Sequence, residues 1–222
     1  MAASRLKSPP LIAVLTGDVV GSSQLADAPR RALPQILQRA GAELKRAFGK
    51  AVPYELEIFR GDSWQLVVTD PALCFRAALF FRACVIAESP GSMRLDTRIG
   101  LAVDRADFVP AKNVSAGNGA AFQASGESLD RLDASVRLAL VASGEKEWRD
   151  VAVRLVDAIV QEWTARQARA VAGRLRGWTQ MQIVEHWPER ITQQTIARHL
   201  ARAHWNALEP ALRQVEHSLS PL

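Results

Sequence analysis

Apolar residues recur along this chain with two different periods, and together these predict alternating strands and helices in its N-terminal part. A continuous apolar run at residues 11–15 predicts a central strand buried on both faces. Strands are expected at residues 11–15, 54–59, 64–69, 94–103 and 134–142, and helices at 30–48, 71–87 and 120–132. This order predicts an α+β domain of the ferredoxin-like or palm-like type.

The C-terminal part has a different pattern, because no strand signal follows residue 143. Helical spacing of apolar positions recurs at residues 145–163, 165–175, 179–187, 192–205 and 210–219. We therefore expect an α+β domain over residues 1–142 and an all-helical domain over residues 143–222.

The amino-acid composition is that of an ordinary globular protein and does not by itself indicate a function. The chain has 222 residues, of which 48% are apolar and 23% are charged, as in an ordinary globular protein. The two cysteines form no metal-binding spacing, and no apolar run reaches membrane-spanning length. We expect a cytoplasmic protein without a membrane partner. Its net charge of +5 is compatible with nucleic acid but does not require it.

The first candidate site lies where the first predicted strand ends. Asp18 follows the apolar run, and Gly21, Ser22 and Ser23 come directly after it. Such a turn offers backbone N–H groups and hydroxyls to a phosphate, while Asp18 offers a hard oxygen ligand. In the predicted topology the hairpin turn that carries Asp62 is a neighbour of this strand end. Two carboxylates so placed repel unless a cation lies between them, so Asp18 and Asp62 predict a Mg²⁺ site.

A structural alternative stays open for both aspartates. Gly-Asp in a hairpin is in the first place a turn signal, and Asp18 before Gly-Ser-Ser can cap the next helix.

Several short motifs in the N-terminal part occur in the same order in a known family. These motifs are Gly17-Asp-Val-Val-Gly-Ser22, Arg60-Gly-Asp-Ser-Trp-Gln65, Arg98-Ile-Gly-Leu101 and Gly119-Ala-Ala-Phe-Gln-Ala-Ser-Gly126. Over residues 10–142 they resemble the SatD-type proteins and, more broadly, the palm of the class III nucleotidyl cyclases. The resemblance implies two metal ions on Asp18 and Asp62, a nucleotide phosphate chain on Val19, Gly21, Ser22 and Ser23, and a homodimer.

Two departures from the cyclase pattern bear on activity. Ile58 stands where cyclases place a purine-selecting lysine or glutamate. Glu127 stands where they place the asparagine that precedes an arginine by one helical turn, although Arg131 matches that arginine. The resemblance therefore implies that metal and phosphate binding are kept, while base selection and transition-state support are changed.

The second candidate site lies at residues 178–205, whose pattern is typical of a helix-turn-helix. Ile183, Ile196 and Leu200 would anchor two short helices, and Thr192 would cap the second. The outward face of that helix would carry Gln193, Gln194, Thr195, Arg198, His199 and Arg202. Glutamine pairs with adenine and arginine with guanine in the major groove. The segment also resembles the sigma-factor and Fis-like helix-turn-helix families.

Charge supports this assignment, since residues 164–213 carry eight Arg or Lys side chains against three acidic ones. An ordinary helical hairpin that docks on another protein remains the alternative.

Three functions follow from these features. The first is a transcriptional regulator that binds double-stranded DNA and whose N-terminal domain binds a nucleotide or a metal-phosphate ligand. The second is a magnesium-dependent nucleotidyl cyclase or nucleotidyltransferase. The third is a binding module with a degenerate palm and no small ligand. The changes at Ile58 and Glu127 favour the first over the second, and the aspartate pair argues against the third.

Overall fold

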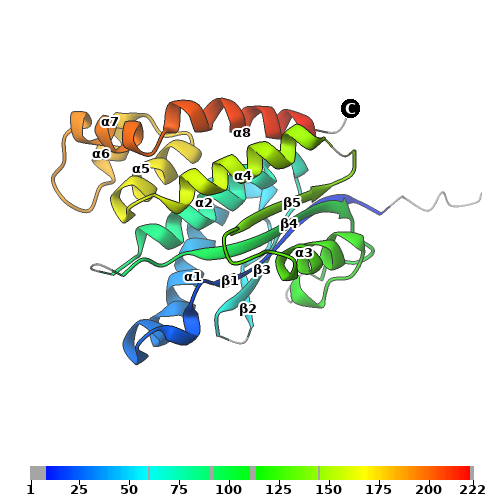
Figure 1. Cartoon of the computed structure of the whole chain (residues 1–222). Helices are drawn as coiled ribbons and strands as arrows, with labels where there is room; N and C mark the ends of the chain where they lie inside the picture. The colour runs from blue at the N-terminus through cyan, green and yellow to red at the C-terminus, as the bar shows by residue number, and fades with distance from the viewer. Residues whose placement is uncertain (1–8, 60, 91–92, 111–113, 145, 221–222) are drawn as a thin grey trace, which may run out of the picture.

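A five-stranded mixed sheet covered by helices forms the body of the molecule (Figure 1). The computed structural model describes residues 9–59, 61–90, 93–110, 114–144 and 146–220. The strands are β1 Leu11–Val19, β2 Glu57–Phe59, β3 Ser63–Val68, β4 Thr97–Arg105 and β5 Leu138–Ala142. The described part contains eight α-helices: α1 Asp27–Phe48, α2 Cys74–Ala87, α3 Ala120–Asp130, α4 Glu147–Gln161, α5 Ala165–Leu175, α6 Gln180–Glu185, α7 Gln193–Arg202 and α8 Trp205–Leu219.

The strand order is β2-β3-β1-β4-β5, and all neighbours are antiparallel except β4 and β5. The predicted order of strands and helices in the N-terminal part is confirmed. β1 runs four residues beyond the predicted end at residue 15, so Asp18 lies within the strand. There it is paired with Ser63 of β3 on one side and with Arg98 of β4 on the other.

The two faces of the sheet are covered unequally. Because side chains alternate along a strand, Ala13 and Leu15 enter the main core under α1 and α2, whereas Ile12 and Val14 enter a smaller cluster under α3. Figure 1 shows α3 on one face and the other long helices on the opposite face. Asp18 has the parity of Ile12 and Val14, and therefore belongs to the α3 face.

The C-terminal helices continue the main core of the sheet. Ala170 and Val171 of α5 lie in one buried hydrophobic cluster with Phe75 and Leu79 of α2, and α8 contributes Leu212 to the same cluster. The core thus crosses the predicted domain boundary at residue 142 without interruption. The division into two domains stays a prediction. None of the described helices is long and apolar enough to cross a membrane.

A buried ion-pair network joins α2, α4 and Asp96, the residue that directly precedes β4. The Arg82 guanidinium is fully buried and donates to both carboxylate oxygens of Asp96, at 2.8 and 3.0 Å, and to Asp157 at 2.5 Å. Arg94 and Arg137 donate to the same Asp96 carboxylate. Each charged side chain in the network therefore has a partner of opposite charge. A buried side chain needs such a partner to stay ionised, because it is not solvated by water.

Candidate functional site

Asp18 is held by Arg98, which lies in one of the family-like sequence motifs but was given no predicted role at the site. Nε of Arg98 donates to Oδ1 of Asp18 at 2.9 Å, and Nη2 donates to Oδ2 at 2.5 Å. The hydrogen bond to Asp18 is the main reason why the pKa of Arg98 is raised. The pair is partly accessible, with 22% of the Asp18 side chain and 36% of the Arg98 side chain exposed. The predicted metal ligand therefore already has a cationic partner from the chain itself.

Asp62 and the Gly21 turn are brought together as the topology predicted. Val19 N donates to the Asp62 carbonyl at 3.2 Å, and the Ser22 hydroxyl donates to the Asp62 carboxylate. Gly21 takes a left-handed conformation with φ of 63°, which allows the chain to turn immediately after β1. The same edge of the sheet thus carries Asp18, Asp62, Val19, Gly21 and Ser22. Arg60 lies outside the described residues.

Ser23 belongs to the same turn and is exposed. Nη2 of Arg30 donates to the carbonyls of Ser23 and Leu25, at 2.6 and 2.9 Å, and so fixes the turn against the start of α1. The Gly21–Ser23 segment is accessible and anchored at both ends. Backbone N–H groups and hydroxyls presented in this way can bind an anionic oxygen.

The donor set does not fit a Mg²⁺ site in this arrangement. Among the described residues no group of three or more His, Cys, Asp and Glu side chains is placed to share a metal ion. A cation on Asp18 would also lie beside the Arg98 guanidinium, and like charges at that range repel. Metal binding at Asp18 would require that Arg98 first leave it.

The second candidate site is built on α7, which the core fixes from one side. Ile196 and Leu200 are buried, and the Thr192 hydroxyl caps the helix by accepting from the Thr195 N–H at 3.2 Å. Gln193, Gln194, Arg198 and Arg202 are all exposed. Gln194, Arg198 and Arg202 follow one another at intervals of four residues and share the face opposite to Ile196 and Leu200, whereas Gln193 is accessible because it begins the helix.

His199 and Thr195 differ from the other predicted contacts because both have intramolecular roles. The His199 ring stacks on Trp187 with centroids 6.0 Å apart, and the Thr195 hydroxyl hydrogen-bonds to that of Thr192 at 3.0 Å. Burial lowers the pKa of His199, and the charges of Arg166, Arg198 and Arg202 lower it further. His199 is consequently a neutral packing residue at pH 7, surrounded by guanidinium groups.

α6 precedes α7 and meets it at their N-terminal ends. The Thr179 hydroxyl accepts from the Gln182 N–H at 3.2 Å, and the Gln182 side chain reaches back to the Thr179 N–H, which fixes the start of α6. Gln180 accepts a hydrogen bond from Gln193 at 3.4 Å.

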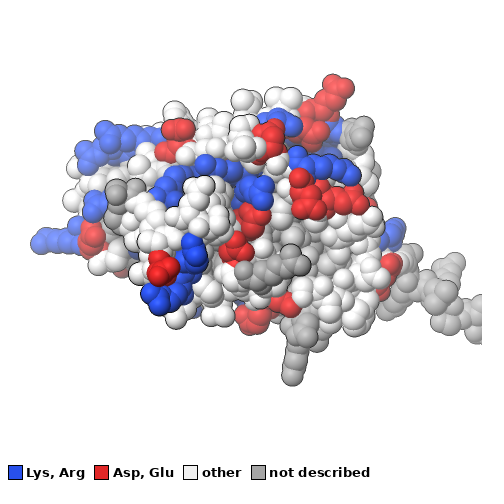
Figure 2. Space-filling model, turned by 60° about the horizontal axis from the view of Figure 1, so that its bottom comes forward, with Lys and Arg blue, Asp and Glu red and all other residues white. Residues whose placement is uncertain are grey.

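Figure 2 shows the charges on one face of the whole molecule. On this face Lys and Arg side chains are interspersed with Asp and Glu side chains, so the positive charge is distributed rather than gathered in one patch.

No protein-family model matches the chain, and no curated protein matches it either. Its function is therefore inferred from residue chemistry and geometry.

Proposed function

We propose that the chain is a DNA-binding regulatory protein whose α6–α7 unit acts as a helix-turn-helix. The observation that carries this proposal is the exposure of two glutamines and two arginines on α7, a helix fixed to the core by Ile196 and Leu200. A rigid helix with such exposed side chains suits the major groove, where these residue types pair with base edges.

The electrostatics of α7 support the same function. Arg198 and Arg202 bring positive charge to α7 beside His199, while Arg166 of α5 lies near the same ring and is paired with Glu189 at 3.0 Å. Phosphate contacts position a protein on DNA, and base contacts then specify the sequence. We assign Arg198 and Arg202 to phosphates or guanine, and Gln193 and Gln194 to base edges.

The N-terminal part serves in this proposal as a ligand-binding domain with a ferredoxin-like palm, similar to that of the SatD-type proteins. The strand order β2-β3-β1-β4, with α1 following β1 and α2 following β3, supports this assignment. The ligand is a nucleotide whose phosphates bind at Val19, Gly21, Ser22 and Ser23. In this proposal the chain forms a homodimer, and each subunit binds one half-site of a DNA operator. The protein acts in the cytoplasm.

Regulation is favoured over catalysis by the Asp18–Arg98 pair. A cyclase or nucleotidyltransferase needs its metal ions on the aspartates, and Arg98 engages both oxygens of Asp18. Mg²⁺ on Asp18 and Asp62 is therefore no part of this proposal, because Arg98 already holds both oxygens of Asp18.

The test is the binding of random duplex DNA as a function of salt concentration. Wild-type protein should bind with a negative log–log salt slope, and Arg198→Gln or Arg202→Gln should each reduce that slope by about 1. Arg131→Gln is the matched control, because it removes the same charge from an exposed side chain of the α3 end and should leave the slope unchanged. Absent or salt-insensitive binding would remove the DNA role.

A further inference from the structure

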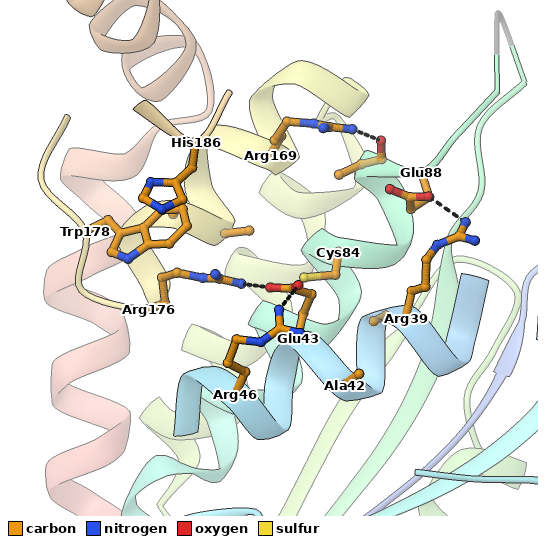
Figure 3. A pocket seen from close by; sticks show the side chains of 14 residues that line it. Arg39, Ala42, Glu43, Arg46, Cys84, Glu88, Arg169, Arg176, Trp178 and His186 are labelled. Atoms are coloured by element: carbon orange, nitrogen blue, oxygen red, sulfur yellow. Dashed lines mark hydrogen bonds and ion pairs between the residues drawn. The ribbon is translucent and has the colours of Figure 1, made fainter. Parts of the chain in front are cut away.

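A cavity of about 650 Å³ lies between α1 and α2 on one side and α5 with the residues that flank α6 on the other (Figure 3). Its walls come from α1, from the C-terminal end of α2, from α5, and from the residues that flank α6. This volume lies in the range of pockets that hold small organic ligands. None of its lining residues belongs to the Asp18 site.

The lining of this cavity carries an excess of positive charge. Its arginines are Arg39, Arg46, Arg169 and Arg176, whereas its acidic residues are Glu43 and Glu88. Glu88 pairs with Arg39 at 2.8 Å, and Glu43 pairs with Arg176 at 2.6 Å and with Arg46. The four arginines and two glutamates give the lining a net charge of +2, and Arg169 is the arginine of the lining that has no lining carboxylate as a partner.

Arg169 differs from the other three arginines in its partners. Its Nη2 donates to the Ala87 carbonyl at 3.1 Å, and its guanidinium lies 5.9 Å from the Trp187 ring centroid. Both partners are neutral, so the charge of Arg169 is not cancelled by them. A guanidinium offers five N–H donors, and these contacts occupy only part of that capacity.

Arg176 is held rigidly at the other side of the cavity. Its guanidinium lies 4.3 Å from the Trp178 ring centroid and 5.0 Å from that of Phe80, and only 13% of its side chain is exposed. Burial alone would raise the pKa of Glu43, but Arg176 and Arg46 outweigh this effect and lower it. Glu43 thus stays ionised and fixes both arginines.

The rest of the wall suits the organic part of a ligand. Ala42, Ala172 and Gly173 present small surfaces, while Trp178 and His186 stack with centroids 4.3 Å apart. Figure 3 shows Arg169 above Cys84, and Arg176 to the left of Cys84 next to the Trp178–His186 stack. Charged donors and an apolar wall therefore border the same space.

We propose that this cavity binds a small organic phosphomonoester. The phosphate lies at the Arg169 guanidinium, and the organic group lies against Ala172 and the stacked rings. A phosphomonoester dianion would balance the net charge of +2 on the lining, and a guanidinium fork binds two phosphate oxygens at once. This site is additional to the nucleotide site proposed at the β1 turn. Trp178 and His186 directly flank α6, so the ligand would contact the proposed DNA-binding unit.

Calorimetric titration of the whole chain in EDTA tests the proposal with defined probes, namely inorganic phosphate, adenosine and adenosine 5′-monophosphate. We expect the monophosphate to bind more tightly than phosphate, and adenosine not to bind. Arg169→Gln should weaken monophosphate binding at least about tenfold, which corresponds to one guanidinium–phosphate contact. Glu88→Gln should strengthen it, because it removes a negative charge from the lining.

Arg213→Gln serves as the control, since Arg213 is 62% exposed on α8 and does not line the cavity. It should leave the affinity unchanged. Absence of monophosphate binding at millimolar concentration would overturn the proposal. So would binding that Ser22→Ala abolishes and Arg169→Gln leaves intact, because the ligand would then sit at the β1 turn. DNA binding is measured separately, so failure here leaves the proposed DNA function untouched.

Discussion

Arg98 engages both carboxylate oxygens of Asp18 across the β1–β4 pair, with N–O distances of 2.9 and 2.5 Å. The two residues are direct partners in the antiparallel register, so the backbone itself places them side by side. The charge that would attract a cation to Asp18 is therefore balanced within the sheet. This relationship makes Arg98, rather than Asp62, the residue that determines whether Asp18 binds metal.

The Asp18–Arg98 pair predicts that removal of Arg98 creates a metal site. Arg98→Gln leaves the Asp18 carboxylate without its cationic partner. The variant also lacks the guanidinium charge that repels Mg²⁺ from this position. We expect the Mg²⁺ affinity of the variant to exceed that of wild type by about tenfold or more. Isothermal titration with MgCl₂ measures the difference.

A second substitution identifies the residue responsible for that gain. Asp18→Asn in the Arg98→Gln background should abolish the added Mg²⁺ affinity, because the ligand carboxylate is lost. Equal Mg²⁺ affinity in wild type and Arg98→Gln would show that Arg98 does not control the site.

The difference between the predicted and the observed site has a physical origin. The order of strands and helices depends on local periodicity, which a sequence displays directly. The Asp18–Arg98 pair depends on strand register, and its members are 80 residues apart. Register is fixed by the whole sheet, so no local pattern places Arg98 on Asp18.

The same distinction applies to α7 and to the cavity. Gln194, Arg198 and Arg202 were predicted on an exposed face because helical spacing alone separates them from Ile196 and Leu200, whereas Gln193 is exposed because it begins the helix. The stack of His199 on Trp187 could not be predicted in the same way, because Trp187 lies in the connection before the helix. The cavity is formed by segments that are distant in sequence, so no local sequence motif predicts it.

The buried network predicts a large stability loss when one of its charges is removed. Arg82→Met leaves Asp96 and Asp157 as buried carboxylates without their main partner. We expect a decrease of about 3 to 5 kcal/mol in the free energy of unfolding. Arg131→Gln breaks an exposed pair with Glu127 and should cost less than about 0.5 kcal/mol. Urea denaturation compares the two, and similar losses would contradict the assigned role of Arg82.

Asp96 predicts a loss of stability in acid. Burial opposes ionisation of Asp96, but Arg82, Arg94 and Arg137 outweigh it and hold its pKa below the ordinary value. A carboxyl with a depressed pKa stabilises the fold above the unfolded value of about 3.9, and this stability is lost as the pH falls through the folded value.

Unfolding free energies between pH 6 and pH 3 measure this dependence. The wild-type values should hold above about pH 5 and decline below about pH 4. Asp96→Asn should be less stable at pH 6 and show a shallower decline, because it has no proton to take up. Parallel profiles for the two proteins would show that other groups cause the acid response.

Thr192 predicts a local effect on the proposed DNA-binding helix. Its hydroxyl accepts the Thr195 N–H at 3.2 Å, so Thr192→Ala leaves the first turn of α7 uncapped. We expect a stability loss of about 1 kcal/mol and faster amide exchange in residues 193–196. Thr192→Ser keeps the capping oxygen and should behave like wild type. Equal exchange rates in the alanine and serine variants would contradict the role of the cap.

Gly100 and Gly126 form a matched pair that tests how closely α3 approaches the sheet. A Cβ on Gly100 of β4 would lie 2.3 Å from the Ser125 carbonyl and 2.5 Å from the Leu129 nitrogen, both backbone atoms of α3. α3 would have to move away from the face that carries Asp18 and Arg98. We expect Gly100→Ala to cost about 1 to 3 kcal/mol, as overpacking does.

A Cβ on Gly126 would meet nothing within 4 Å, although Gly126 lies in α3 itself. Gly126→Ala should therefore stabilise the chain by about 0.5 to 1 kcal/mol, because alanine loses less conformational freedom in a helix. Thermal and urea denaturation of both variants would show opposite signs. A neutral Gly100→Ala would mean that α3 is not held at this distance, and that the Asp18–Arg98 face is more open than the packing of Gly100 indicates.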